Sequence, residues 1–536
     1  MIGRRAYGTR LAGQKFKLLP EYKLRCGLEI HTQLCTANKL FSASTNSPFA
    51  AADKPNYHTS YFDVSLPGTQ PLFNHEVLLL ATKLSIALNC DVNLNSQFDR
   101  KHYFYGDQPL GYQITQHYSP FASNGFLRLR SIFDDIDQDS KIIEIQQLQI
   151  EQDTGKSVYK EQDSKSLIDF NRSNVPLIEM VTRPDFTDLK QIRSFLKKYQ
   201  NLVRHLGVST GDLETGAMRV DVNISVNDYA RVELKNLPNT SSIFNAIKFE
   251  YQRHVDIIRN GDAEETLTHS QTRGWNGSST VKLRSKETTI DYRYMPDPEL
   301  PRITLAEDFV PGVSQLMPEL PDQVLERLMS APYSLSLKDA KILTINSNSH
   351  DQLYTQHQLQ QFYLDTFKMY QQQAGESFNH KLPTNWIIHE LLGNMNKLEI
   401  YLEKVVEILP PEEFSNLLMF IHEGKVSKAS AKLLLFHILN SFKESNFKST
   451  SSLDLSSLIK EFELDAIEVV PQEDLRQICQ GIIDDLGDDN MIKGIISGKK
   501  KNSLKYLVGQ GMRLSQGRIK PHLFESTFKD ILGVKW

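Results

Sequence analysis

The chain has little cysteine and no long run of apolar residues. Its four cysteines, in 536 residues, lie far apart and form no Cys-x-x-Cys pair. This spacing argues against a disulfide framework and a thiolate zinc site, and it is typical of a protein in a reducing compartment. No apolar stretch approaches the roughly 18 residues that a membrane-spanning helix requires. We therefore expect a globular protein that is not inserted in a membrane.

The chain also lacks an excess of positive charge, since its formal net charge is −4. Any contact with nucleic acid must therefore come from a local basic patch. The one concentrated basic stretch lies near the C-terminus and comprises Lys499, Lys500, Lys501, Lys505 and Arg513, with further basic residues up to Lys520. Such a run is usually a solvated surface, but it can equally hold phosphate groups.

The first twenty residues lack acidic side chains, because no Asp or Glu precedes Glu21. The same segment carries Arg4, Arg5, Arg10, Lys15 and Lys17. A basic, acid-free leader is typical of an organelle transit peptide, and the alternative is a disordered basic start. We predict that residues 1–20 direct the protein to mitochondria.

The hydrophobic pattern predicts an α+β fold. In residues 21–310, alternating runs at 142–145 and 219–224 indicate strands, and amphipathic stretches indicate helices near 75–89, 187–205 and 241–259, the last beginning at Ser241 or Ser242. Few strand–helix–strand alternations occur, which favours an antiparallel sheet.

Helical patterns then replace the strand signal. They fill a predicted helical domain at 311–450 and a small helical tail domain at 451–536. Residues 440–456 are rich in Ser, Lys and Asn and look like a linker.

Two segments imitate known catalytic motifs but lack required residues. Thr154–Ser157 resembles the end of a phosphate-binding P-loop, but Ile150 stands where that loop needs glycine. Asn276–Thr280 resembles a serine amidase motif without its flanking glycines, so a turn is the better interpretation. Neither segment indicates the function.

The segment Gly27–His31 is more informative, because Glu29 and His31 are two residues apart in a β-prone run. Strand side chains alternate, so both would leave one face while Leu28 and Ile30 leave the other. Oxygen ligands with a nearby imidazole suit a hard cation, although a solvated strand face has the same pattern. Further polar segments combine acidic with basic side chains. The acids can hold Mg²⁺ and the cations can neutralise phosphate charge. These segments are 98–105, 111–114, 151–156, 169–172, 176–179, 218–225, 233–237 and 291–298.

In this order, these segments closely resemble the B-subunit family of glutamyl-tRNA(Gln) amidotransferases. The resemblance begins at Leu24, is dense up to Pro298, and returns at 384–386 and 504–510. It implies an antiparallel cradle domain, a helical domain and a tail that grips tRNA. It also implies that ATP and Mg²⁺ phosphorylate the γ-carboxyl of glutamate on tRNA(Gln), after which ammonia displaces phosphate. The ammonia would come from the family's amidase (A) component, in a mitochondrial-matrix heterotrimer with a small third subunit (C, or its fungal equivalent F).

The resemblance also implies roles for individual residues. Metal-site residues would be Glu29, His31, Glu151, Gln152 and Glu179, of which all but Gln152 are also catalytic candidates. Lys101 and Tyr103 match catalytic residues at the mouth of the ammonia path. Candidates for binding phosphate are Arg172, Arg219, Lys235 and Arg293, for which buried ion pairing is an equal alternative. The basic stretch from Lys499 to Arg513 would bind tRNA.

This sequence departs from the family pattern at two places. Many relatives have an acid where this chain has Gln152. We therefore expect the Gln152→Glu variant to stay active and to bind Mg²⁺ more tightly. Some relatives carry cysteine pairs that could bind zinc; here those positions hold Ser42, Ser44, Ser60 and Asp63, so we expect no zinc.

Two alternative functions remain open at this point. A non-catalytic RNA-binding scaffold would explain why Gln152 stands in place of an acid. Such a protein would not, however, need the other clustered acidic side chains. A free-standing ATP-dependent amide ligase acting on a small substrate would give the long helical region no role.

Overall fold

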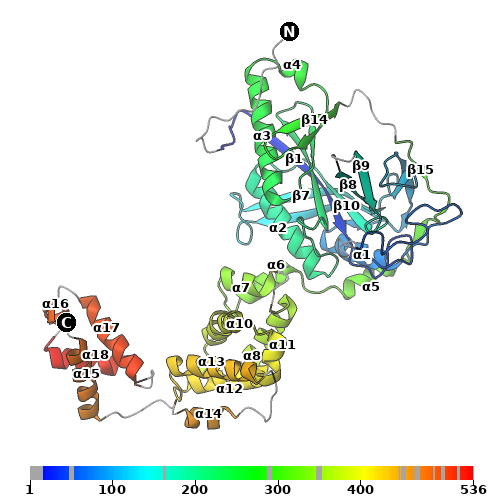
Figure 1. Ribbon diagram of the computed structural model, residues 1–536. Helices are drawn as coiled ribbons and strands as arrows, with labels where there is room; N and C mark the ends of the chain where they lie inside the picture. Colours follow the sequence, from blue (N-terminus) through cyan, green and yellow to red (C-terminus); the bar gives the residue numbers. More distant parts are fainter. Residues whose placement is uncertain are drawn as a thin grey trace. The chain divides into compact units, whose positions relative to one another are not determined.

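The computed structural model describes residues 16–47, 54–160, 164–285, 292–345, 353–445, 447, 454–462, 464, 471–486, 489–496, 501–515 and 519–534. The chain divides into two compact units, residues 1–323 and 324–536. The first is built around a sheet and the second is helical (Figure 1), so the predicted α+β class is confirmed. The finer division near residue 450 stays a prediction.

A twisted nine-stranded sheet forms the centre of the first unit. All neighbouring strands are antiparallel except β12 and β13, which run parallel. In spatial order the strands are β14 (Thr280–Ser285), β13 (Gln271–Trp275), β12 (Val232–Lys235), β11 (Met218–Val226), β1 (Leu24–Gln33), β10 (Pro176–Thr182), β7 (Ser140–Gln152), β6 (Ala122–Arg130) and β2 (Asp91–Val92). The predicted strands at 142–145 and 219–224 are parts of β7 and β11.

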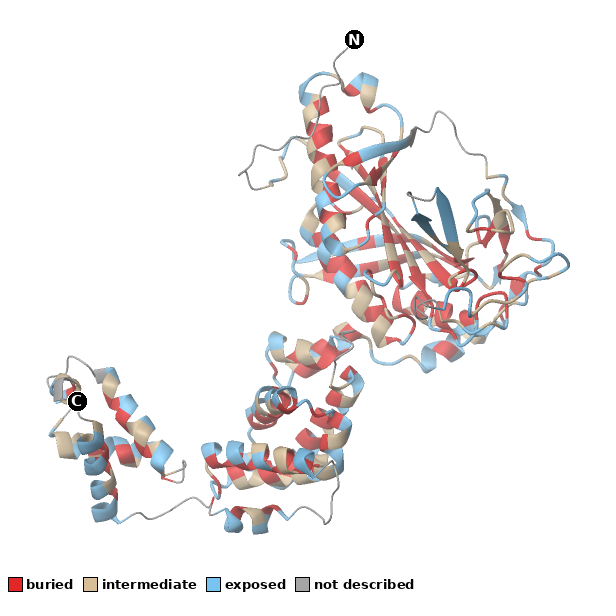
Figure 2. Ribbon diagram, in the orientation of Figure 1, coloured by how far each residue is buried: buried red, intermediate tan, exposed pale blue. Residues whose placement is uncertain are grey.

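Helices α2 (Leu189–His205) and α3 (Thr240–Arg259) pack on one face of this sheet (Figure 1). Leu28 and Ile30 of β1 are fully buried on that face, and the Thr32 hydroxyl lies 2.8 Å from the Tyr199 hydroxyl of α2. Figure 2 shows the buried residues concentrated along the sheet and the inner sides of these helices. Alternation therefore directs Glu29, His31 and Gln33 to the opposite face.

Smaller sheets accompany the polar face. One contains β15 (Met295–Pro296), β4 (Asp99–His102) and β5 (Tyr112–Thr115), and another pairs β8 (Lys156–Lys160) with β9 (Lys165–Asp169). A third pairs β16 (Ile303–Thr304) with β3 (Asn95–Ser96). The Thr115 hydroxyl lies 3.2 Å from carboxylate oxygen Oε2 of Glu151 in β7, which ties the first small sheet to the central one.

The predicted helices are present with shifted ends. The expected helix at 75–89 is α1 (Glu76–Ala87), and α3 begins earlier than predicted. Its N-cap is Asn239, not Ser241 or Ser242, because the Asn239 side chain accepts the Ser242 backbone N–H. The remaining helices of this unit are α4 (Ala263–Thr266), α5 (Phe309–Gln315) and α6 (Pro321–Met329), which extends into the second unit.

The described part of the second unit contains helices and no strands. The α-helices are α7 (Leu337–Thr344), α8 (Gln356–Ala374), α9 (Lys381–Thr384), α10 (Leu392–Leu398), α11 (Leu402–Ile408), α12 (Pro411–His422), α13 (Lys428–Glu444), α14 (Leu455–Glu461), α15 (Gln472–Leu486), α16 (Asp489–Ile496), α17 (Leu504–Leu514) and α18 (Pro521–Leu532). A π-helical turn, η3 (Asn385–Leu391), and two 3₁₀ turns, η2 (Gly375–Ser377) and η4 (Lys501–Ser503), complete it.

The predicted linker at 440–456 is wrong at both ends. Residues 440–444 belong to α13, where Phe442 is buried, and residues 455–456 begin α14. Residues 446 and 448–453 lie outside the described part of the chain.

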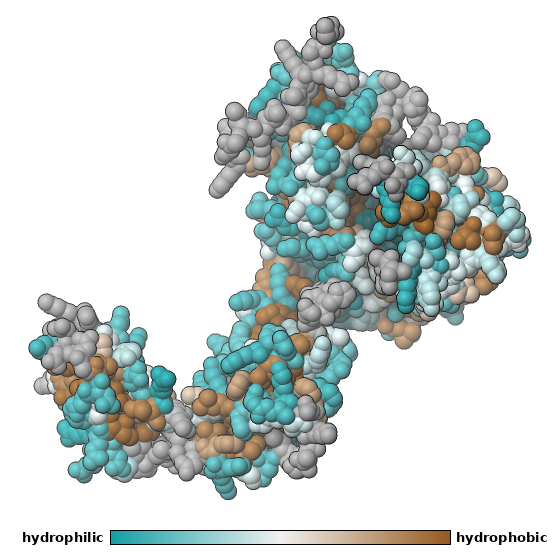
Figure 3. Space-filling model, viewed as in Figure 1, coloured by the Kyte–Doolittle hydropathy of each residue, from teal (hydrophilic) through white to brown (hydrophobic). Residues whose placement is uncertain are grey.

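The last helices of the second unit have an apolar core of their own. Buried residues of α15, α17 and α18 form a separate apolar cluster around Phe524 and Phe528. Figure 3 shows polar residues interspersed with apolar ones on the visible face of each unit. No helix in the described residues has both the length and the apolar character to cross a membrane.

Candidate functional site

The candidate site lies on the polar face of the central sheet, where β1 runs between β10 and β11. His31 is the register partner of Glu179 in β10 and of Arg219 in β11. Directly opposed residues in an antiparallel pair share a face. The three side chains therefore project together, away from α2 and α3.

A histidine and two carboxylates form the most compact part of the site. His31 Nε2 lies 3.2 Å from Glu151 Oε1 and 3.7 Å from Glu179 Oε1. One ligand atom from each of the three residues lies within 4.8 Å of the others. The Glu151 side chain is 4% exposed and that of His31 is 24% exposed, so a small cation can reach a group that is otherwise shielded.

Mutual interactions shift the protonation of this group. Burial alone lowers the pKa of His31, but the hydrogen bond and charge of Glu151 outweigh burial and raise that pKa to about 9. Burial raises the pKa of Glu179, and the nearby charge of Glu151 raises it further, to about 7. Burial also opposes ionisation of Glu151, yet the hydrogen bond from His31 keeps its pKa below the ordinary value. Without a cation, protons therefore compensate the negative charge near neutral pH.

Glu29 does not belong to this compact group. Its carboxylate forms a second group with Asp221 of β11 and Glu233 of β12, and it accepts a hydrogen bond of 2.8 Å from the Asn223 amide. Asp221 and Glu233 were not predicted as site residues from the sequence. Alternation within 219–223 indicated a polar strand face, but only the register Glu29↔Asp221 shows which strand it meets.

The predicted phosphate-binding cations Arg219, Lys235 and Arg172 have protein partners. Arg219 forms an ion pair of 2.9 Å with buried Asp153, and Lys235 forms one of 2.8 Å with Asp221. Arg172 donates hydrogen bonds to the backbone carbonyls of Thr154 and Gly155. Arg219 and Lys235 thus form the ion pairs that were the alternative interpretation, and Arg172 supports the backbone of the loop after β7.

The fourth predicted cation, Arg293, is exposed beside β15. Its φ of 45° lies in the left-handed region, which is strained for an arginine. The His102 ring nitrogen Nδ1 lies 2.9 Å from its carbonyl oxygen and helps to hold this conformation.

Lys101 and Tyr103 lie beside the histidine and the acids, at the end of β4. Burial alone lowers the pKa of Lys101, but the charges of Tyr294, Glu151 and Glu179 outweigh it and raise that pKa. Burial raises the pKa of Tyr103, and the charge of Glu151 adds to the effect. Lys101 is therefore charged and Tyr103 neutral at physiological pH.

The structure does not bring Gln152 to the acids, which corrects the sequence prediction. Leu177 and Pro176 are the register partners of Glu151 and Gln152, so these two side chains leave opposite faces of β7. Asp153 returns to the polar face, where it pairs with Arg219. Gln152 is buried towards the core side, and its side-chain oxygen has no hydrogen-bond partner among the described residues.

We therefore revise the expected effect of Gln152→Glu. A carboxylate placed on the core side at this position should destabilise the first unit by about 1–3 kcal/mol, because it is buried without a cation partner. Mg²⁺ dependence should not change. A Mg²⁺ titration and a thermal unfolding curve check both points, and tighter Mg²⁺ dependence at unchanged stability would contradict the assigned face.

The positions at which a zinc site was considered form a hydrogen-bond network around Asp63. The Asp63 carboxylate accepts from Lys39 Nζ at 3.1 Å, the Ser42 hydroxyl at 3.0 Å and the Ser60 backbone N–H at 2.8 Å. The carbonyl of Ser44 accepts the backbone N–H of Lys39 at 3.0 Å. A buried ion pair thus cross-links this loop.

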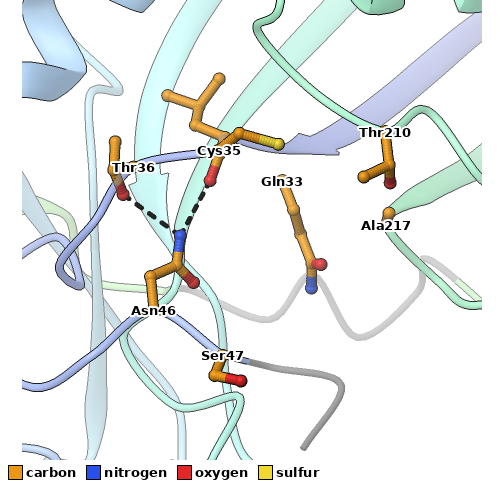
Figure 4. Close-up of a pocket in the computed structure, with 8 residues that line it drawn as sticks. Gln33, Cys35, Thr36, Asn46, Ser47, Thr210 and Ala217 are labelled. Carbon is orange, nitrogen blue, oxygen red and sulfur yellow. Dashed lines mark hydrogen bonds between the residues drawn. The ribbon is translucent and has the colours of Figure 1, made fainter. Parts of the chain in front are cut away.

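A cavity of about 320 Å³ lies beyond the end of β1, and none of the predicted site residues lines it. In Figure 4 the Asn46 amide donates to the Leu34 carbonyl and the Thr36 hydroxyl, and Gln33 and Ser47 are among the other lining residues. Gln33 connects the cavity with the site, because its amide donates to Asp153 at 3.1 Å.

Two of the predicted tRNA-binding residues are described fully. Lys505 and Arg513 are exposed on α17, eight residues apart. Lys501 begins the 3₁₀ turn η4, and Lys499 and Lys500 lie outside the described residues.

Comparison with known proteins agrees with the resemblance over the whole chain. A family model described as the GatB/GatE catalytic domain matches residues 24–311, and one described as the GatB domain matches residues 368–532. Relatives named as the mitochondrial B subunit of glutamyl-tRNA(Gln) amidotransferase occur in Lachancea thermotolerans (66% identical, 99% of this chain and 97% of the relative) and Zygosaccharomyces rouxii (64%, 100% of both). A relative of the same name in Saccharomyces cerevisiae strain YJM789 is 62% identical over 96% of both chains.

These relatives also agree with the predicted mitochondrial location, since each is named as a mitochondrial protein. The identities extend through both units, which carry the sheet-based site and the helical region. The chain belongs to the family of B subunits of glutamyl-tRNA(Gln) amidotransferases, and it is one component of an amidotransferase.

Proposed function

We propose that the polar face of the central sheet activates the γ-carboxyl group of glutamate esterified to tRNA(Gln). The carboxylate oxygen attacks the γ-phosphorus of ATP, so that a glutamyl acyl phosphate and ADP form. Ammonia then attacks the acyl carbon and inorganic phosphate leaves, which gives glutaminyl-tRNA(Gln). A carboxylate is a poor acyl donor, and phosphorylation supplies the leaving group.

The observation that carries this proposal is the His31–Glu151–Glu179 group, with Lys101 beside it. Two anions, ATP and a carboxylate, must approach each other, so the site has to place positive charge between them. Glu151 and Glu179 lie 3.2 Å and 3.7 Å from the same His31 nitrogen, so the acids are crowded, and crowded acids favour a divalent cation.

The residues present fit Mg²⁺. Glu151 and Glu179 offer carboxylate oxygens and His31 a ring nitrogen, while Glu29, Asp221 and Glu233 offer a second set of oxygens. Bound Mg²⁺ would neutralise phosphate charge during the transfer. Thr115 and Asn223 orient the carboxylates of Glu151 and Glu29 through hydrogen bonds.

Lys101 and Tyr103 have complementary roles in this proposal. The charged Lys101 lies close enough to Glu151 and Glu179 to balance their charge when phosphate is transferred. Neutral Tyr103 can donate a hydrogen bond to ammonia or to the acyl phosphate beside the same acids. The ammonia would come from the amidase (A) component of a heterotrimer whose small third subunit is C or F.

Lys505 and Arg513 support a role for the C-terminal helices in binding tRNA. Both are exposed cations on α17, and side chains eight residues apart lie near one face of a helix. Phosphate contacts of this kind supply affinity without sequence specificity. Lys499, Lys500 and Lys501 would add to this patch.

Mg²⁺ affinity should rise with pH between about pH 7 and pH 9. Glu179, with a pKa of about 7, and His31, with a pKa of about 9, must lose their protons to act as ligands, so protons compete with the cation below these values. Calorimetric Mg²⁺ titrations from pH 6.5 to 9.5 measure the effect. His31→Gln is the control and should flatten the upper part of the profile; a pH-independent affinity of the wild type would contradict the assignment.

The function is tested by bypassing the ammonia supply. The chain, with its amidase partner, receives glutamyl-tRNA(Gln), ATP, Mg²⁺ and ammonium chloride, and glutaminyl-tRNA and ADP are measured. Wild type should form both, and His31→Ala and Glu29→Ala should lose both while still binding tRNA. Amidation without ATP, or unchanged variants, would favour the scaffold alternative. Amidation of free glutamate without tRNA would favour the small-substrate ligase.

A further inference from the structure

Aromatic rings gather beside the site, and the proposed function uses only Tyr103 among them. They come from three short segments: 103–105 after β4, 117–118 after β5, and 292–294 before β15. Because β4 pairs with both β5 and β15, the small sheet brings these segments together. We call Tyr105, Tyr103, Tyr292, Tyr294, His117 and Tyr118 the aromatic series.

The rings of the aromatic series contact one another in sequence. The ring centroids are 5.7 Å apart for Tyr105 and Tyr103, 6.5 Å for Tyr103 and Tyr292, 6.0 Å for Tyr292 and Tyr294, and 3.8 Å for Tyr294 and His117. The last pair is stacked, with 9° between the ring planes. Such distances are typical of direct aromatic contacts.

Both ends of the aromatic series reach solvent. Tyr105 is 66% exposed and Tyr118 is 61% exposed, and His117 is also exposed. Tyr118 is nevertheless held in place, because its hydroxyl donates to the Tyr294 carbonyl at 3.2 Å. Exposed aromatic rings in a fixed arrangement are typical of a binding surface.

Lys101 joins the aromatic series to the catalytic group. Its ammonium lies 4.8 Å from the centroid of the Tyr292 ring, and the charges of Glu151 and Glu179 act on the same ammonium. A ligand whose end lies at the acids therefore has its adjoining part beside the tyrosines.

We propose that the aromatic series is the stacking surface for the unpaired bases at the 3′ end of the acylated RNA. The inference rests on the proposed function, because the glutamate is esterified to the terminal ribose and its γ-carboxyl must reach the acids. The terminal base then lies within one amino acid's length of them. Every base has a π-face, so stacking on tyrosine and histidine tolerates any sequence.

Two observations favour RNA over the adenine of ATP, which has the same stacking chemistry. The aromatic series contains several successive rings, which is more than a single base covers. The exposed Arg293 lies between Tyr292 and Tyr294 in the sequence and adds positive charge beside the rings, which favours an RNA backbone. An RNA strand offers both successive bases and phosphates between them.

The test uses the full complex and glutamyl-tRNA whose 3′-terminal base is replaced by 2-aminopurine, a base whose fluorescence falls when it stacks. Wild type should quench the fluorescence without ATP. Tyr294→Leu should remove the quenching and raise the KM for acylated tRNA roughly 10-fold or more, with the KM for ATP unchanged. Tyr294→Phe, which keeps the ring, should behave like wild type.

Tyr401→Leu is the matched control, because Tyr401 is 55% exposed and lies in the second unit; it should leave all three quantities unchanged. If Tyr294→Leu fails to fold, His117→Ala at the exposed end gives the same test. Unchanged quenching with unchanged KM for tRNA would overturn the proposal, and so would a rise confined to the KM for ATP. Since quenching needs no ATP, this result is independent of whether the phosphorylation step is correct.

Discussion

Glu151→Gln should lower ammonia-dependent formation of glutaminyl-tRNA by at least about 100-fold. Glu151 is a buried carboxylate that contacts His31 and accepts a hydrogen bond from the Thr115 hydroxyl of the small sheet. Because it is buried, water cannot replace its charge. The amide keeps the shape and removes the charge. The initial rates of glutaminyl-tRNA and ADP formation at saturating Mg²⁺ measure the effect.

A second measurement distinguishes this electrostatic role from general damage. The raised pKa of His31 depends on the hydrogen bond and charge of Glu151, so it should fall from about 9 in Glu151→Gln. Titration of the histidine signals by NMR reports this directly. Glu144→Gln is the matched control, because Glu144 lies in the same strand but its side chain is 58% exposed. Equal activity loss in both variants, or an unchanged His31 pKa, would refute the assigned role.

Asp63→Ala should destabilise the first unit by about 3–5 kcal/mol. Neither partner of the Lys39–Asp63 pair has exposed side-chain surface. Removal of the carboxylate leaves a buried ammonium whose remaining hydrogen bond, among the described residues, is to the Phe170 carbonyl at 3.1 Å. Three further donors, the Ser42 hydroxyl, the Ser60 backbone N–H and the Asn174 amide, also lose their acceptor. Differential scanning calorimetry of the full chain measures the loss.

The hydrogen-bond network around Asp63 also connects it to the candidate site, so the Asp63→Ala change should affect that site. Asn174 and Arg172 lie in the link before β10, and β10 carries Glu179. Lys39→Met combined with Asp63→Asn should recover part of the stability, because no charge is buried and an acceptor oxygen remains. Lys190→Met is the control, since its pair with Asp137 is exposed and should contribute little. A small effect of Asp63→Ala would show that water or another cation replaces the pair.

Local sequence predicted the parts of the site that lie within single strands. Alternation placed Glu29 and His31 on one face of β1, and the structure agrees. The same rule, applied to Glu151 and Gln152, would have excluded Gln152 as a companion ligand, because adjacent strand residues leave opposite faces. The resemblance to relatives with an acid at that position favoured Gln152 instead.

What the sequence did not predict is which residues lie opposite each strand. The Glu29 carboxylate groups with Asp221 and Glu233, and Arg219 and Lys235 form the ion pairs that were one of two alternatives. None of these partners is adjacent in sequence. They depend on which strands neighbour β1 and in which register.

By itself, then, the sequence determined the family, the α+β class, several strands and helices of the first unit, and which side chains of one strand share a face. Periodicity and composition are local properties of the sequence, so they can be read without knowing which strands are neighbours in the sheet. Only the tertiary structure decided that Glu151 and Glu179 meet His31, that Asp63 holds buried Lys39, and that six rings from three segments contact one another beside Lys101. The ring contacts join residues up to 189 positions apart, as Tyr103 and Tyr292 are. The register of these groupings is set by backbone hydrogen bonds and packing between distant segments.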